Sequence, residues 1–246
     1  MKFEKMMMRF VGLVLVVAVL GGCAGTVRVE SEAGLQEMYG AAVKDAAVAE
    51  AEEISRDLTA IVPYNDELVW EDEKREKVLV VTWTSWDGYD DYVGKTMDLQ
   101  RAVWVTAVPE LQRFCKRTGL EGGAMSLRLE QLLGVPPNDG KTKFIEIWVD
   151  VEDLFRPCPD PEVSDREAEL DFPVSGRFVT VSPEHKDWFL KQKEMSYGPN
   201  GYPWTRLGYT YDWGNPQSHV GLSEFVIREG SEIKIHRIYS TGDYCR

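Results

Sequence analysis

The sequence feature that most constrains the fold is a set of three short apolar runs rich in β-branched and aromatic residues. These runs are "KVLVVTW" at 77–83, "RAVWVTAV" at 101–108 and "KFIEIWVD" at 143–150. Runs of this length and composition are typical of buried β-strands. Between the second and third runs, "PELQRFCKRTGL" predicts a helix that begins at Pro109 and ends at Gly119, because proline fits a first helical turn and glycine a helix end. The chain therefore combines strands with helices.

Further helix and turn signals define the fold class. "SLRLEQLLG" predicts a helix capped by Ser126 and ended by Gly134, and the Ser-Pro-Glu sequence at 182–184 predicts a helix that runs to about Ser196. Two extended runs flank Gly230 and predict a β-hairpin. The succession of strand, helix, helix and strand predicts an α/β or α+β fold, with a single mixed domain whose sheet is covered by a few helices.

The segment before the first strand has a different composition. From Ala24 to about Ile61 it is rich in alanine and glutamate, which favour helices, but its apolar stripe is thin. We therefore expect a helical or flexible leader. The alternative, a helix that docks on the domain, requires buried partners for Ile54, Leu58 and Ile61. The predicted organisation is a signal peptide at 1–22, a lipidated N-terminus with the Ala/Glu-rich leader at 23–62, and the mixed α/β domain at 63–246.

The N-terminus has the parts of a secretion signal. Three basic residues precede an apolar run at 10–20, which is shorter than the ~20 residues that a bilayer-spanning helix needs. A transmembrane anchor is the alternative. The quartet at 20–23, Leu-Gly-Gly-Cys, resembles the lipobox of bacterial lipoproteins, and this resemblance implies a diacylglyceryl group on the thiol of Cys23. Because Ala24 rather than aspartate follows, the resemblance also implies sorting to the outer membrane in a Gram-negative source.

The charge of the chain limits its partners. The 246 residues include 28 Lys and Arg against 41 Asp and Glu, a formal net charge of -13. A nucleic-acid partner is not expected, because a phosphate backbone requires a basic face. An acidic surface also repels anionic lipid headgroups, so the lipid on Cys23 would supply the membrane attachment. We expect a lipid-anchored protein of the cell envelope, periplasmic or associated with the outer membrane.

Three cysteines remain after Cys23. In an oxidising compartment, this odd number predicts one disulfide and one thiol. We expect Cys158 to pair with Cys245, because both lie in irregular stretches. Cys115 would then remain a thiol on the buried face of a helix.

Motifs for metals and cofactors are not evident. No two cysteines have a two-residue spacing, and His185, His219 and His236 are scattered along the chain. The sequence has no phosphate-binding glycine loop and no Gly-x-Ser-x-Gly elbow. It therefore predicts no metal site, no cofactor and no catalytic residues, and it favours a binding protein over an enzyme.

The strongest functional signal is the aromatic-rich stretch "YGPNGYPWTRLGYTYDWGN" at 197–215. Its prolines and glycines predict a loop, which a short strand follows. One interpretation is a binding surface for a glycan or a peptide, since exposed aromatic rings with nearby polar groups suit such ligands. The other is a purely structural role, in which the aromatics form the core and rim of a sheet. The candidate ligand-binding residues are Trp204, Arg206, Tyr209, Asp212 and Trp213.

The same region resembles part of an enzyme family. "GYPWTRLGYTYDWG", followed by "GLSEFVIREGSEIKI", resembles the C-terminal part of ADP-ribosyltransferase-like toxins and their NAD-hydrolysing relatives. The resemblance implies NAD as a cofactor, with Glu224 stabilising the charge that develops on the ribose and Arg206 pairing with the pyrophosphate. It also implies that Tyr209 or Trp204 stacks on nicotinamide. The sequence departs from the family at Leu222, where a carboxylate or glutamine is usual.

Overall fold

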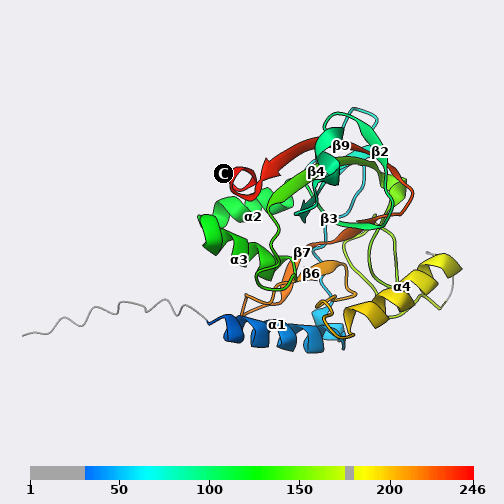
Figure 1. Cartoon of the computed structure of the whole chain (residues 1–246). Helices are drawn as coiled ribbons and strands as arrows, with labels where there is room; N and C mark the ends of the chain where they lie inside the picture. Colours follow the sequence, from blue (N-terminus) through cyan, green and yellow to red (C-terminus); the bar gives the residue numbers. More distant parts are fainter. Residues whose placement is uncertain (1–30, 175–179) are drawn as a thin grey trace, which may run out of the picture. The chain divides into compact units, whose positions relative to one another are not determined.

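Seven strands of the described chain form one antiparallel sheet in the order β2-β9-β4-β1-β3-β8-β5 (Figure 1). The computed structural model describes residues 31–174 and 180–246, so the predicted signal peptide and Cys23 lie outside the described residues. This sheet and its helices confirm the predicted mixed α/β fold. The strands are β1 (Lys77–Thr84), β2 (Thr96–Asp98), β3 (Val103–Ala107), β4 (Lys143–Asp150), β5 (Leu154–Phe155), β8 (Phe225–Ile227) and β9 (Glu232–Ser240).

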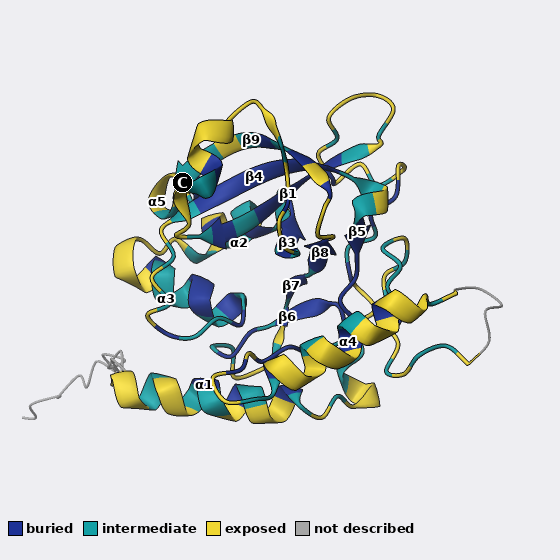
Figure 2. Cartoon of the chain, turned by 45° about the vertical axis from the view of Figure 1, so that its right-hand side comes forward, coloured by how far each residue is buried: buried dark blue, intermediate teal, exposed yellow. Residues whose placement is uncertain are grey.

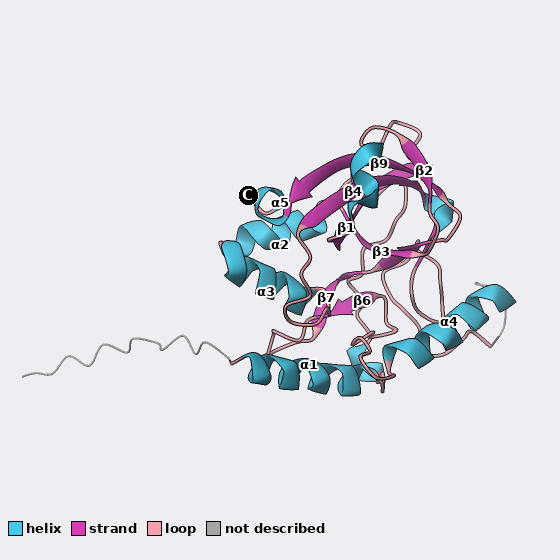
Figure 3. Ribbon diagram, in the orientation of Figure 1, coloured by secondary structure: helices cyan, strands magenta, loops and turns pink. Residues whose placement is uncertain are grey.

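Helices flank the sheet (Figure 3). α2 ends where the sequence predicts, whereas α3 begins earlier than predicted. α2 follows Pro109 and stops at Gly119, whose positive φ of 62° suits the predicted helix end. α3 begins before its predicted cap, and the Ser126 hydroxyl instead donates to the carbonyl of Gly122 inside the helix. The helices are α1 (Glu32–Ala46), α2 (Glu110–Thr118), α3 (Gly122–Leu132), α4 (Pro183–Ser196) and α5 (Thr241–Tyr244), with 3-10 turns η1 (Ala51–Glu53), η2 (Asp87–Tyr92) and η3 (Val151–Asp153).

A second, smaller sheet consists of β6 (Tyr209–Tyr211) and β7 (Val220–Ser223). Figures 1 and 2 both show it between the seven-stranded sheet and the helices α1 and α4. β6 comes from the aromatic-rich stretch. That stretch therefore lies inside the domain, with elements packed on both sides of it.

The hairpin predicted around Gly230 does not form. β8 pairs with β3 and β5, whereas β9 pairs with β4 and β2. The turn between them bonds to a different segment: the N–H of Gly230 donates to the carbonyl of Leu99 (2.8 Å), and the N–H of Leu99 donates to the carbonyl of Ser231 (3.0 Å). Because this turn leads the chain from one part of the sheet to another, the two strands that flank it are not neighbours.

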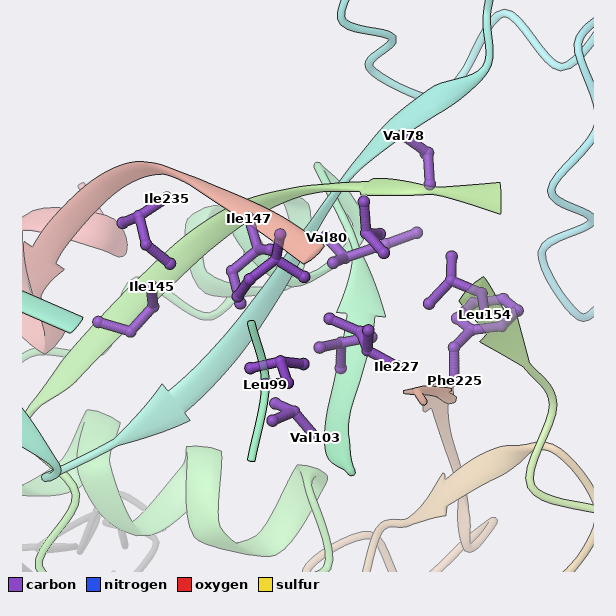
Figure 4. Packing of buried hydrophobic residues seen from close by; sticks show 14 of the residues in the cluster. Val78, Val80, Leu99, Val103, Ile145, Ile147, Leu154, Phe225, Ile227 and Ile235 are labelled. Atoms are coloured by element: carbon purple, nitrogen blue, oxygen red, sulfur yellow. The ribbon is translucent and has the colours of Figure 1, made fainter. Parts of the chain in front are cut away.

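The two faces of the seven-stranded sheet bury different side chains. We call the face that carries Val80, Ile147 and Ile235 the aliphatic face; all three residues are 0% exposed and belong to the cluster in Figure 4. The opposite face carries Val81 and Trp83, which share a second cluster with side chains of α2, α3 and α5, and we call it the helix face. Neighbouring residues such as Val80 and Val81 reach opposite faces because side chains alternate along a strand.

From residue 31 onward, the leader belongs to the domain. Residues Ser31–Arg246 form one compact unit. The Tyr39 hydroxyl of α1 donates to the carbonyl of Gly201 (3.1 Å), and Leu58 and Ile61 are each 2% exposed. The domain boundary predicted at residue 63 is therefore wrong, because the few large apolar side chains of the leader find buried partners, as the docked-helix alternative requires.

The predicted pairing of Cys158 with Cys245 is also wrong. Cys245 forms a disulfide with Cys115, and Cys158 is a buried free cysteine. Cys115 lies on α2 and Cys245 directly follows α5, and both helices pack on the helix face of the sheet. The Cys158 thiol instead lies in the proline-rich loop and donates to the carbonyl of Asp160 (2.6 Å).

Candidate ligand-binding cavity

A cavity of about 490 Å³ lies between the seven-stranded sheet and the aromatic-rich stretch. Strands β1 and β3 border it on one side, and β6, α4 and the loop at 202–204 border it on the other. Its volume is within the range of ~300–1,000 Å³ that is usual for small-ligand sites. The aromatic residues that line it are Trp83, Tyr89, Trp104, Phe144, Tyr202, Trp204 and Tyr211.

The hydrogen-bonded ladder between β1 and β3 ends at this cavity. The two strands pair only at Val80 with Ala107 and at Val81 with Thr106. Beyond these pairs, β1 continues along β4 and β3 continues along β8, so each strand keeps its other neighbour. The two strands therefore part within the sheet while both remain extended.

Main-chain groups of the two strands face the gap between them. The N–H of Val108 donates to the carbonyl of Leu79 (3.1 Å), so the odd-numbered residues of β1 direct their N–H and C=O groups toward β3. By this alternation, the first residues past the end of the ladder are Trp83 and, opposite it, Trp104. Thr82 and Trp83, whose side chains point to opposite faces, both line the cavity, which places the main chain itself at the cavity wall.

Two polar side chains, the buried Thr106 and the partly buried Glu224, lie at the end of this gap where the two strands meet. Glu224 lines the cavity, and desolvation raises the pKa of its carboxyl to about 8. Among the described residues, no hydrogen bond or opposite charge offsets this effect. At neutral pH the carboxyl is protonated, and it can donate as well as accept. Thr106 also lines the cavity, and its buried Oγ1 has no hydrogen-bond partner among the described residues. Because Val105 pairs with Phe225, Thr106 and Glu224 are neighbours across β3 and the start of β8.

A second carboxyl with a raised pKa lies outside the cavity wall. Burial raises the pKa of Glu110 on α2 to about 7, although hydrogen bonds with Ser223 and Thr59 act in the opposite direction. The carboxylate accepts from the N–H of Ser223 (3.5 Å), the residue before Glu224. Glu110 thus links α2 to the small sheet and changes charge over part of the same pH range as Glu224.

The predicted aromatic platform is wrong, because its side chains point into the protein. Trp204, Tyr209 and Trp213 are 4%, 1% and 6% exposed, and each donates its ring N–H or hydroxyl to a backbone carbonyl. Trp204 packs under α4, against Trp188 and Phe189. Of the predicted ligand-binding residues, Trp204 is the one that lines the cavity.

Asp212 and Arg206, the two charged residues of the predicted platform, have structural partners. Both terminal nitrogens of Arg128 donate to the carboxylate of Asp212, which is buried. Arg206 has a positive φ of 61° and donates to the carbonyl of Ala47 (3.1 Å) in the leader. Arg206 is not among the residues that line the cavity, so the structure does not bring it together there with Glu224, the partner that the enzyme resemblance implies.

Thr106, Trp83 and Trp104 were not among the site residues predicted from the sequence. Their segments were assigned to buried strands, which is correct, but a strand assignment does not show where two strands part. The sequence did contain a signal for them. The runs "VTWT" at 81–84 and "VWVTA" at 103–107 include threonines, although both strands were expected to be buried and apolar. Polar residues inside otherwise apolar strands are good candidates for a cavity wall.

No known protein family, curated protein or solved structure matches this chain. Within residues 31–174 and 180–246, no helix combines the length and the apolar character that crossing a membrane requires. The function is therefore inferred from the cavity and from the sequence of the N-terminus.

Proposed function

We propose that this protein is a cell-envelope lipoprotein, anchored through Cys23, that binds an extended peptide segment in the cavity between β1 and β3. The observation that carries the proposal is the ladder that ends at Val81 and Thr106 while both strands continue along the cavity. A peptide that adds to the edge of a strand gains main-chain hydrogen bonds, and pockets beside the edge select its side chains. The gap offers two such edges.

Each part of the cavity has a role in this proposal. The main-chain groups of Trp83 and Trp104 would bond to the peptide backbone. The protonated carboxyl of Glu224 and the hydroxyl of Thr106 would bond to an amide or hydroxyl of the ligand at the end of the gap where β1 and β3 meet. Apolar peptide side chains would contact the aromatic wall that includes Trp204.

A peptide fits these walls better than a glycan, the other ligand that the sequence predicts. Sugar binding by stacking requires an open aromatic face. Trp204 is almost fully buried, and Trp104 packs against Trp188 and Trp204 with ring centroids 6.1 Å apart in both pairs. Tyr202, at 49% exposure, is the one exposed aromatic residue among the described residues of the cavity wall. The main-chain groups of Trp83 and Trp104, together with the side chains of Thr106 and Glu224, suit an amide-bearing ligand.

The binding experiment uses the full chain purified in detergent and a library of N-acetylated, C-amidated hexapeptides. We expect saturable binding of a subset of the library, measured by tryptophan fluorescence and by calorimetry. N-methylation of the central amides of a bound peptide should abolish binding, because it removes the donors that a strand edge requires. The variant Thr106→Val should weaken binding, and the matched variant Thr96→Val, at an exposed position of β2, should not.

Three results would contradict the proposal. Saturable binding of cell-wall glycan fragments, without binding of any peptide, would assign the cavity to sugars. Binding of neither class would favour the purely structural role. Peptide binding that is insensitive to N-methylation would show that the strand edges are not the recognition element.

The membrane anchor is tested separately with Cys23→Ser. Buried acyl chains contribute about 0.8 kcal/mol per CH₂, so a lipidated cysteine holds a protein at a membrane durably. We expect the wild type in the membrane fraction with an acylated N-terminus, and the variant in the soluble or unprocessed fraction. An unmodified N-terminal mass for the wild type, with the same detergent partitioning in both, would exclude the anchor without affecting the cavity.

A further inference from the structure

We propose that Asp45, Glu53 and His219 form a zinc site that fastens the leader to the small sheet. One ligand atom from each residue lies within 4.8 Å of the other two. His219 Nε2 and Glu53 Oε1 are 3.3 Å apart. In a tetrahedral site with metal–ligand bonds of ~2.0–2.2 Å, ligand atoms lie about 3.4 Å from one another. Two of the three atoms therefore already have this spacing, and a shift of about an ångström in the exposed Asp45 side chain would bring in the third.

The two carboxylates are already held in place by other contacts. The Tyr211 hydroxyl donates to Asp45 Oδ2 (2.7 Å), which leaves Oδ1 for a metal. The N–H of Glu50 donates to Glu53 Oε2 (2.7 Å), which leaves Oε1 directed toward His219. Contacts that orient ligands in this way are typical of metal sites, where partners of the ligands fix their geometry.

The imidazole of His219 is also fixed. It stacks on Tyr211 with ring centroids 4.9 Å apart and on Tyr209 with centroids 6.1 Å apart. Its Nε2 lies 3.2 Å from the hydroxyl of Tyr209 and faces Glu53. Zinc would bind the lone pair of the neutral ring, so an Nε2 that carries a proton in the metal-free protein would release it on binding.

The set of donors favours zinc over the hard cations. One imidazole nitrogen and two carboxylates are ligands that zinc accepts in four-coordinate sites, with a water in the fourth position. Calcium takes 6–8 oxygen ligands, and magnesium keeps most of its waters. Glu53 and His219 border a recess too narrow for a water molecule, so the fourth ligand would enter from the side of the exposed Asp45.

The site joins three segments that are far apart in the chain. Asp45 lies at the end of α1, Glu53 in η1, and His219 directly before β7. A bound ion would therefore hold the leader against the β6–β7 sheet. The scattered histidines led the sequence analysis to predict no metal site, because the spacing of these residues gives no motif. This inference does not depend on the ligand of the cavity.

The experiment uses the full chain in detergent, treated with a chelator and titrated with zinc chloride in a calorimeter. We expect one zinc ion per chain, and binding at least about tenfold weaker in His219→Ala and in Asp45→Asn. The matched control is His236→Ala, which removes another partly exposed histidine near a carboxylate, that of Glu146 (4.0 Å), and should leave the affinity unchanged. Calcium chloride should produce no saturable signal.

Limited trypsin digestion gives a second readout. Lys44 and Arg56 flank the proposed ligands, and zinc should slow cleavage at both positions in the wild type but not in His219→Ala. Asp45 is exposed, so Asp45→Asn is expected to fold. It therefore tests the zinc site even if His219→Ala does not fold. The proposal is overturned if the wild type binds no zinc, if both ligand variants bind zinc as the wild type does, or if His236→Ala loses binding to the same extent.

Discussion

The aliphatic face and the helix face of the seven-stranded sheet differ in how completely their polar groups are satisfied. On the aliphatic face, no member of the buried cluster around Val80 and Ile147 has a buried side-chain nitrogen or oxygen without a partner among the described residues. On the helix face, the same strands present the unpartnered hydroxyl of Thr106 to a cavity that Glu224 also lines. A buried polar group without a partner costs roughly 1–3 kcal/mol. We infer that one face supplies stability, whereas the other retains polar groups for a ligand.

The largest expected effect is on the aliphatic face. Ile147→Ala should lower the free energy of unfolding by about 2–5 kcal/mol, because Ile147 is fully buried and its neighbours cannot fill the space. Denaturant titration measures this loss. The control Leu190→Ala removes a side chain of α4 that is 57% exposed, and it should change the stability by no more than about 0.5 kcal/mol. Equal effects of the two substitutions would contradict the assignment of stability to this face.

Glu224 should make the stability depend on pH. Its folded-state pKa of about 8 exceeds the value of ~4.3 for an unfolded glutamate, so the folded protein retains a proton that the unfolded chain releases. The contribution to stability is fully present below pH ~4, and it is lost as the pH rises to about 8, with a slope of at most ~1.4 kcal/mol per pH unit. Glu224→Gln keeps the shape and stays neutral, so it should remove this contribution.

The measurement is a set of unfolding curves between about pH 5 and pH 8. Glu110→Gln is the comparison, because burial raises the pKa of Glu110 to about 7 and its contribution should end at a lower pH. The double variant should have the flattest profile. If Glu224→Gln and the wild type have parallel profiles, Glu224 is not a neutral acid in the folded protein, and the proposed hydrogen bond from its protonated carboxyl to the ligand is excluded.

Local signals in the sequence predicted most strands of the sheet and the helices α2 and α4. β1 and β4 could be predicted because their apolar runs are continuous, as expected for strands buried on both faces. α4 could be predicted because Ser182 caps it and accepts from the N–H of His185. These features depend on a few neighbouring residues, and no distant contact overrides them.

The predictions that were wrong concern features that depend on contacts between distant parts of the chain. The hairpin predicted at Gly230 does not form, because the main chain of Leu99, far away in the sequence, is hydrogen-bonded to the turn. The predicted disulfide pairing was wrong, because which two of the three cysteines pair depends on where α5 packs. The exposed aromatic platform failed because α4 covers Trp204. The cavity exists where β1 and β3 part, and that point is set by the other neighbours of both strands.

The smallest change in the free energy of unfolding is expected for Thr106→Val, which is compared with the opposite substitution on the aliphatic face. Thr106→Val keeps the shape of the side chain and removes a buried hydroxyl that has no partner in the described part of the chain. The free energy of unfolding should therefore stay the same or rise by up to about 1 kcal/mol. Val80→Thr makes the reverse change on the aliphatic face, in the ladder pair next to that of Thr106. It buries a hydroxyl among apolar side chains and should cost about 1–3 kcal/mol.

The two variants should also separate stability from binding. Thr106→Val removes a hydroxyl from the cavity wall, so it should weaken peptide binding while the protein stays as stable as the wild type or becomes more stable. Val80 does not line the cavity, so Val80→Thr should lower the unfolding midpoint without changing the affinity of the protein that remains folded. A loss of stability in Thr106→Val comparable to that in Val80→Thr would mean that the Thr106 hydroxyl has a stabilising partner. In that case the helix face would be as well satisfied as the aliphatic face, and the reason for placing a ligand next to Thr106 would disappear.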